Sequence, residues 1–567
     1  MKLSVAKLIS KHSKLSEKQA SELMEIPPSP ELGDFAFPCF SLSKEFKKNP
    51  AIISKELSER ISKSLPKEIE RVESNGPYIN FFVNKILLAE KTINQILKEE
   101  DSYGKPKKSG KKIVIEFPSP NTNKPLHLGH LRNMSIGESI SRILEFEGNR
   151  VVRVNLNNDR GVHICKSMLA YQKFGKNSTP EKSKMKSDHF VGYYYVLFNK
   201  ELEKNPKLDE EAQNLLVKWE EGDKKALELW KKMNTWALKG FKETYKNFGV
   251  KIDKDYYESQ IYKKGKEIIQ DGLKKGVFFK KEDGAIAIDL KSGGLDEKVV
   301  LRSDGTSVYI TQDLYLAKLK FDQYKPEKSI YVTGNEQDYH FKVLVLILKK
   351  LGFSFADRIY HLSYGMVFLP EGKMKSREGK VVEADDLIDQ VKKMVKHEIN
   401  ARVKLSEKEL EKRSLTIALA AIKYALLKIE ASKNMTFNPN ESISLEGNTG
   451  PYLLYSYARA KSILRKIKKG KKEINKSKPK SLNESEKALI TKLSEFSEIV
   501  ASSLHQMNPS AIANYSFLLC QCFNEFYHNS PVLNSENESF RLELVKAFSQ
   551  TIKNALNLLG IDVLEEM

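Results

Sequence analysis

Short apolar runs alternate with helical repeats through the middle of the chain, and this pattern predicts strands joined by helices. Residues 113–117 and 151–156 are apolar runs of strand length. Between them, apolar residues recur at the spacing of one helix face: Ile136, Ile140, Ile143 and Leu144. A strand, a helix and a second strand of this length indicate a parallel sheet with a right-handed crossover. The runs at 329–332 and 363–369 predict that this sheet continues later in the chain.

Other regions follow different patterns. Residues 1–108 contain turn-then-strand segments at 33–37 and 76–83 and predict a small α+β domain. Residues 176–298 are rich in Lys and Glu and predict a helical insertion. From about residue 400 helical spacing prevails, in the segments 417–429, 453–467, 485–504 and 540–559. We therefore expect an α/β protein with three domains, at 1–108, 109–400 (containing the insertion) and 401–567.

Composition narrows the class of protein. A chain of 567 residues allows about three or four domains of roughly 150 residues each, and its 40% apolar content argues against general disorder. The net charge of +21 is a moderate indication of a phosphate-bearing partner such as nucleic acid. The four cysteines are scattered, which excludes a zinc knuckle and fits a reducing cytoplasm. No window approaches the ~20 apolar residues of a membrane span.

The loop after the first strand of the predicted sheet carries candidate chemistry. It reads from Pro118 to His130 and leads directly into a helix, whose N-terminus offers free N–H groups to phosphate. His127 and His130 are three residues apart, so both lie on one face of the first turn. Gly129 leaves room for a base or ribose to approach the backbone. Two surface histidines, or half a metal site, would be the ordinary interpretation of this spacing alone.

A second segment, at 365–382, runs from a strand into a loop with glycines and several cations. Such a loop can close over a triphosphate and neutralise charge that develops at the α-phosphate. An ordinary basic surface loop is the alternative. A similar Lys-Met-Lys-Ser string begins at Lys184, but no strand or glycine flanks it, so we do not assign it to the nucleotide.

Together the two segments resemble the HIGH and KMSKS signatures of class I aminoacyl-tRNA synthetases. The resemblance implies a Rossmann-like catalytic domain and activation of an amino acid by ATP. One departure is that Ser376 follows Lys375, so the second lysine of KMSKS is missing from its usual place. Arginine-specific members often share this departure and carry a lysine before HIGH, where Lys124 stands here. The implied catalytic residues are Lys124, His127, His130 and Lys373.

Further segments resemble arginyl-tRNA synthetases in particular. They include 119–132, 155–161, 309–313 and 334–340, together with C-terminal segments at 446–455 and 523–528. The resemblance implies an arginine site formed by Ser119, Asn121, Asn155, Tyr309, Asp313 and Gln337. It implies an ATP site formed by His127, Gly129, His130, Gly334, Met366, Lys373 and Ser376. A carboxylate suits the planar fork of arginine, although a helix-surface salt bridge would be the ordinary role of an isolated Asp313.

The expected reaction is arginine–tRNA ligation. Arginine would be activated as its adenylate and transferred to tRNA(Arg), with release of AMP and pyrophosphate. ATP with Mg²⁺ would be a substrate, and no tightly bound metal is expected. The N-terminal domain would be an additional tRNA-binding domain and the C-terminal bundle would bind the anticodon, in a cytoplasmic monomer. Rival hypotheses are a class I synthetase for another amino acid, a non-catalytic tRNA-binding paralogue, and a general nucleotidyltransferase of the same fold.

Overall fold

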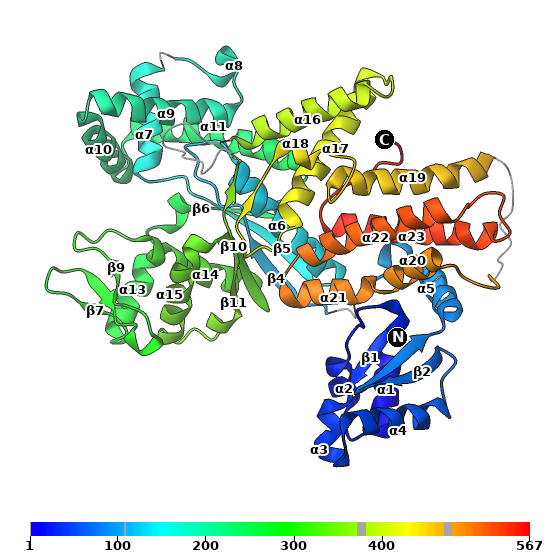
Figure 1. Cartoon of the computed structure of the whole chain (residues 1–567). Coiled ribbons are helices and arrows are strands. Elements are labelled where there is room, and N and C mark those ends of the chain that lie inside the picture. The colour runs from blue at the N-terminus through cyan, green and yellow to red at the C-terminus, as the bar shows by residue number, and fades with distance from the viewer. Residues whose placement is uncertain (1, 107–108, 176, 371–381, 470–478) are drawn as a thin grey trace. The chain divides into compact units, whose positions relative to one another are not determined.

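The computed structural model describes residues 2–106, 109–175, 177–370, 382–469 and 479–567 (Figure 1). The chain forms two compact units. The larger unit comprises Gly104–Ser462, Ser497–Phe517 and Ile552–Met567. The smaller unit comprises Met1–Tyr103, Ile463–Phe496 and Leu518–Thr551. Each unit is described separately below.

A five-stranded parallel sheet forms the centre of the larger unit, in the spatial order β11-β10-β4-β5-β6. Its strands are β4 (Lys112–Glu116), β5 (Arg150–Asn157), β6 (Lys254–Tyr257), β10 (Lys328–Gly334) and β11 (Ile359–Tyr364). The interior of β4 is apolar and fully buried, as expected for a strand covered on both faces. The parallel sheet predicted from the sequence is confirmed, but of the run predicted at 363–369 only Ser363 and Tyr364 belong to it.

Strand order determines where this sheet can hold a ligand. From β4 the chain adds β5 and β6 on one side, then returns to add β10 and β11 on the other side. The order therefore reverses at β4. In open parallel sheets, ligands bind outside the carboxyl ends of the strands at such a reversal. The loops that follow β4, β5 and β10 meet at this edge.

Helices join and cover the strands of the larger unit. Helix α6 (Leu128–Phe146) joins β4 to β5, and α7 (Val162–Phe174) follows β5. Helix α14 (Tyr309–Tyr324) precedes β10, and α15 (Asp338–Lys350) joins β10 to β11. The inserted region contains α8 (Pro180–Ser183), α9 (Ser187–Lys204), α10 (Lys207–Glu221) and α11 (Lys224–Phe248). Beyond the sheet come α16 (Ala384–Asn400), α17 (Glu407–Leu427) and α18 (Pro439–Ser442). A short parallel pair, β12 (Val367–Phe368) and β13 (Met435–Thr436), lies between α15 and α18 in the chain.

Beyond Phe248 the inserted region contains strands as well as helices. Strand β6 then belongs to the central sheet, and α12 (Glu258–Ile261) and α13 (Gly265–Lys274) follow. A small antiparallel sheet comes next, formed by β7 (Phe279–Lys280), β8 (Ile286–Ile288) and β9 (Lys298–Leu301). The expectation of helix throughout 176–298 is therefore wrong where strands β6 to β9 occur. Strands of two to four residues offer too few alternating positions for periodicity to reveal them.

The smaller unit contains a three-stranded antiparallel sheet in the order β1-β3-β2. Its strands are β1 (Phe35–Pro38), β2 (Ile69–Asn75) and β3 (Tyr78–Val83), as the turn-then-strand segments predicted. Its N-terminal helices are α1 (Lys2–His12), α2 (Glu17–Leu23), α3 (Ser43–Phe46), α4 (Pro50–Ser62) and α5 (Lys85–Glu99). Tyr103 ends this segment and donates its hydroxyl to the carbonyl of Leu493, 2.8 Å away.

The C-terminal region is helical, as its spacing predicted. Its helices are α19 (Gly450–Lys469), α20 (Glu484–Ser494), α21 (Phe496–Gln506), α22 (Ser510–Asn529) and α23 (Glu538–Leu558). The expected single helix at 485–504 is two helices that meet at Glu495. Among the described residues, every helix is too short or too polar to span a bilayer.

Candidate functional site

The loop after β4 is fixed by the end of β5. The Ser119 amide donates to Oδ1 of Asn155 at 3.0 Å, and Nδ2 of Asn158 donates to the Ser119 carbonyl at 3.3 Å. Asn155 is fully buried, and its own Nδ2 donates to Asn157 and Asp255. Ser119 has a positive φ of 56°, an uncommon conformation that is often retained at functional sites. The predicted residues Ser119 and Asn155 are thus in direct contact.

The entrance of α6 is capped by its two histidines. Nδ1 of His127 accepts from the Gly129 amide at 3.1 Å, and Nδ1 of His130 accepts from the His127 amide at 3.1 Å. Their ring centroids are 4.0 Å apart. Because each Nδ1 accepts a hydrogen bond, each neutral ring carries its proton on Nε2. Both rings therefore keep an Nε2–H donor for another group.

Both histidines are uncharged at neutral pH. Burial, together with the charge of Lys124, lowers the pKa of His127 to about 4. Burial, with His127 and Lys124 nearby, holds the pKa of His130 well below its usual value. Neutral N–H donors at a helix N-terminus, beside the Lys124 cation, suit a phosphate that must be held and then released. The structure brings the three predicted residues together.

Gly129 is required by the position of the His127 ring. A Cβ at Gly129 would lie 2.9 Å from Cε1 and 3.0 Å from Nδ1 of His127. Carbon atoms essentially never approach each other so closely. Any side chain at Gly129 would therefore displace the ring that caps the helix.

Two buried residues just beyond the histidines, which sequence reasoning missed, anchor α6. Arg132 is fully buried and donates to the carbonyls of Met366, Ala431 and Lys433, at 3.2, 3.1 and 2.7 Å. Asn133 donates to the carbonyl of Val332 in β10 at 2.6 Å. Arg132 could have been predicted as a buried anchor, because it is a charged residue on an otherwise apolar helix face. These bonds fix the helix entrance over the edge of the sheet.

The second predicted segment flanks the same entrance. Lys373 and Ser376 lie outside the described residues. After them, the Leu128 amide donates to the Val382 carbonyl at 3.1 Å, and the Ala384 amide donates to the Leu126 carbonyl at 2.8 Å. Residues 382–384 therefore run antiparallel to residues 126–128.

A group of buried charges lies near the predicted specificity residue Asp313. Oδ2 of Asp313 pairs with Nε2 of His340 at 2.6 Å. Lys320, two turns further along α14, pairs with Glu116 at the end of β4. Burial raises the pKa of Glu116 and lowers that of Lys320, and Asp313 adds a further negative charge near both. Glu116 was missed from the sequence, although it is a charged residue in an otherwise apolar strand.

The remaining predicted residues lie on the rims of these loops. Asn121 is exposed and bridges Asn158. Gly334 ends β10, and Gln337 is exposed in the following short helix, Asn335–Gln337. Tyr309 begins α14 and is 73% exposed. Asn121, Tyr309 and Gln337 are therefore accessible to a ligand.

Comparison with protein families gives three consecutive matches. Residues 92–439 match the catalytic domain of class I tRNA synthetases (R). Residues 453–567 match the DALR anticodon binding domain. Residues 1–83 match the arginyl tRNA synthetase N terminal domain.

Individual proteins give the same result. The arginine–tRNA ligase of Treponema denticola is 50% identical, with 96% of this chain and 94% of the relative covered. That of Borrelia hermsii is 44% identical over the same shares. The arginyl-tRNA synthetase structure of Thermus thermophilus superposes with a TM-score of 0.83 at 25% identity, and covers 100% of this chain and 99% of its own. The chain therefore belongs to the arginyl-tRNA synthetase family of class I aminoacyl-tRNA synthetases.

Proposed function

We propose that this protein, an arginine–tRNA ligase, performs its reaction at the carboxyl edge of the parallel sheet, between the entrance of α6 and the charges around Asp313. ATP binding follows from its class I family. The observation that carries the location is the pair of neutral histidines at the N-terminus of α6, at the reversal of strand order. Ligands bind at such reversals. The three domains at 1–108, 109–400 and 401–567 remain part of this proposal.

In the proposed mechanism, the protein positions its substrates and stabilises charge. The arginine carboxylate attacks the α-phosphate of ATP, and pyrophosphate leaves. The Nε2–H groups of His127 and His130 donate to phosphate oxygens, and Lys124 and Lys373 supply positive charge. No covalent bond to the protein is needed. ATP would enter as its Mg²⁺ complex, held through its own phosphates.

Arginine specificity would come from the acidic side of the site. Asp313 accepts from the guanidinium, and Glu116 adds negative charge close by. Their present partners, His340 and Lys320, keep these carboxylates paired in the absence of substrate. Ser119, Asn121, Asn155, Tyr309 and Gln337 would complete the arginine site. Gly129, Gly334, Met366 and Ser376 would line the nucleotide.

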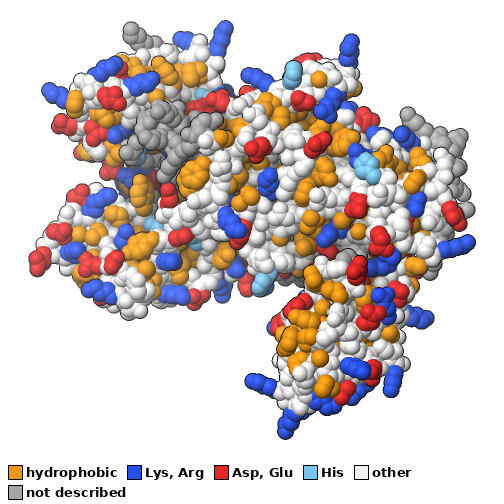
Figure 2. Space-filling view, viewed as in Figure 1, with side chains coloured by type: hydrophobic (Ala, Val, Ile, Leu, Met, Phe, Trp, Pro, Cys, Tyr) orange, Lys and Arg blue, Asp and Glu red, His pale blue; other side chains and the backbone are white. Residues whose placement is uncertain are grey.

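The tRNA is the second substrate, and its terminal ribose hydroxyl would attack the adenylate. The family usually needs tRNA before activation proceeds, and we expect the same here. The N-terminal segment, which matches the family's N terminal domain, would be an additional tRNA-binding domain. In Figure 2, apolar side chains gather on the segment that Figure 1 draws in blue, and its exposed apolar residues include Leu3, Ile26, Phe40 and Ile52. A cytoplasmic location and a monomeric state remain predictions.

Charging of bulk tRNA with each of the twenty labelled amino acids, with and without ATP, tests the proposal. ATP-dependent charging by arginine alone is expected. Charging of tRNA with another amino acid would overturn the role assigned to Asp313, but not the proposed phosphate site. Binding of tRNA without any charging would favour a non-catalytic paralogue.

A further inference from the structure

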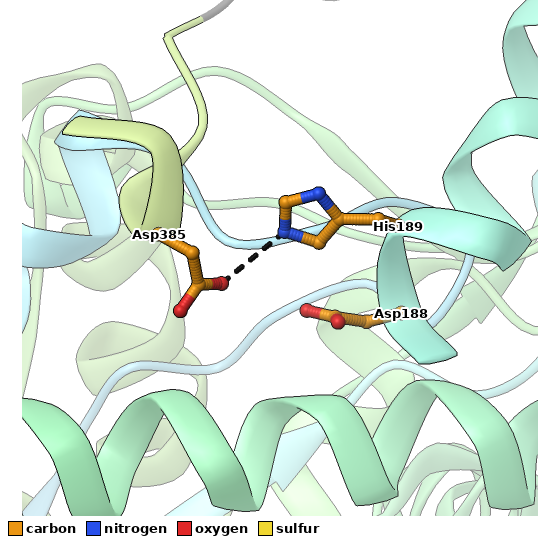
Figure 3. Close-up of side chains that lie close together, drawn as sticks. All are labelled: Asp188, His189 and Asp385. Atoms are coloured by element: carbon orange, nitrogen blue, oxygen red, sulfur yellow. Dashed lines mark hydrogen bonds and ion pairs between the residues drawn. The ribbon is translucent and has the colours of Figure 1, made fainter. Parts of the chain in front are cut away.

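The N-terminal end of helix α9, in the inserted region, contacts residues 383–385, which follow the predicted nucleotide segment at 365–382. Nδ1 of His189 lies 2.6 Å from a carboxylate oxygen of Glu383. Nε2 of His189 lies 3.2 Å from Oδ2 of Asp385 at the start of α16 (Figure 3). Although burial opposes protonation, the hydrogen bonds to Asp385 and Glu383 raise the pKa of His189 to about 10. The imidazolium thus bridges two carboxylates from its two ring nitrogens.

Lys186 closes this network. Its ammonium lies 2.8 Å from Asp385 and 3.0 Å from Asp188, and Thr244 of α11 donates to Asp385 at 3.0 Å. The carboxylate of Asp188 is fully buried and lies against Gly240 of α11. Two cations, Lys186 and His189, lie among three carboxylates, and burial raises the pKa of the third carboxyl, Asp188. The protein itself therefore neutralises most of the charge in this network. The network is therefore a link between segments rather than a site for a cation.

Glu383 carries this link to the candidate nucleotide site. Its carboxylate contacts His189, and its backbone is the antiparallel bridge partner of His127. The hydrogen bonds of Leu128 to Val382 and of Ala384 to Leu126 flank this bridge. Two short contacts therefore connect α9 to the residue that caps α6.

A second contact reaches the same loop from the same helix face. Gly192 is three residues after His189, so the two share one face of α9. A Cβ at Gly192 would lie 2.4 Å from Cδ of Pro125 and 3.5 Å from Cα of Lys124. The backbone of α9 therefore lies directly against the loop that presents Lys124, and leaves no space for even a methyl group.

We infer that α9 positions the ATP-binding entrance of α6, through the contact of His189 with Glu383 and the contact of Gly192 with Pro125. The inference rests on the proposed nucleotide site. It gives the inserted region a role in the reaction: holding the backbone at 382–384 and the loop at 124–127 in register, so that the donors of His127 and His130 stay aimed. His189 and Gly192 are positioning residues that touch no substrate.

The test compares two variants of the full-length protein, His189→Ala and Gly192→Ala, in arginine charging with tRNA. One removes the charged bridge, and the other inserts a methyl group without changing any charge. We expect each to raise the KM for ATP by about tenfold, the equivalent of one lost charge-assisted hydrogen bond. The KM for arginine should stay within about twofold. Lys173→Gln is the matched control, because it breaks an exposed ion pair between α7 and Glu211 of the inserted region.

Amide hydrogen exchange provides a readout that does not depend on activity. In His189→Ala, the amides of Leu128 and Ala384 should exchange faster, because their bonds hold the two segments together. Amides in the sheet core should keep their protection. A general loss of protection, with equal rises in the KM for ATP and for arginine, would reduce these residues to an ordinary structural role and overturn the inference. An unchanged KM for ATP in both variants would also overturn it. Failure of the unmodified protein to charge arginine would instead refute the proposed function.

Discussion

Gly129→Ala tests the link between one backbone position and the phosphate site. The added Cβ would lie 2.9 Å from Cε1 of His127, whereas ordinary contact begins at 3.4 Å, so the ring must move by about 0.5 Å. That movement strains the hydrogen bond from the Gly129 amide to Nδ1 and shifts the Nε2–H donor. Misplacement of a catalytic group by about 1 Å can cost ~100-fold in rate. We therefore expect kcat/KM for ATP to fall between about tenfold and 100-fold.

The fold should survive this change, because alanine is a better helix residue than glycine by about 1 kcal/mol. ATP–pyrophosphate exchange in the presence of arginine and tRNA measures the effect, and thermal unfolding checks the fold. Ser141→Ala is the matched control, since it removes only a bond to the Gly137 carbonyl within the same helix. Full exchange activity in a folded Gly129→Ala protein would refute the role assigned to the His127 ring.

Three further predictions concern charges. Asp313→Asn should raise the KM for arginine about tenfold to 100-fold and leave that for ATP unchanged; equal values for arginine in variant and parent would contradict the pocket. Lys320→Met should destabilise the protein by about 3 kcal/mol in thermal unfolding, because Glu116 loses its buried partner; Lys318→Met, which breaks an exposed pair, should cost less than about 0.5 kcal/mol. Burial lowers the pKa of Lys423 to about 8 in the folded protein. Between pH 8 and 10 the unfolded chain therefore binds more protons than the folded protein, so the free energy of unfolding should rise with pH there by about 2 kcal/mol. Lys423→Met should lack this rise in denaturant unfolding; an identical pH dependence would contradict it.

The sequence predicted the elements whose side-chain patterns are long and regular. The buried run at 113–117, the loop to His130 and the helix that follows were all located from spacing alone, and the structure confirms them as β4, the loop and α6. The C-terminal helices were predictable for the same reason. Strands β7 and β8 were missed because two or three residues carry no usable period.

Contacts between distant segments could not be predicted. Glu116 and Lys320 are 204 residues apart, and the residues around each of them in the sequence do not indicate that they pair. The same holds for His189 and Asp385, which are 196 residues apart. Lys186 was set aside as a false match to the second signature, yet it lies in the network next to the segment that follows that signature. Its ion pairs depend on how the inserted region folds back, which spacing does not encode.

The most direct test of the account measures ATP–pyrophosphate exchange for the parent protein and for His130→Asn, with arginine and tRNA present. Asparagine can still accept from the His127 amide and so preserve the cap, but it cannot supply the Nε2–H donor. We predict arginine-dependent exchange in the parent and a loss of at least about 100-fold in the variant, as for removal of a donor to developing charge. Exchange at the parental rate in a folded His130→Asn protein would contradict the central claim that this histidine holds the phosphates of ATP.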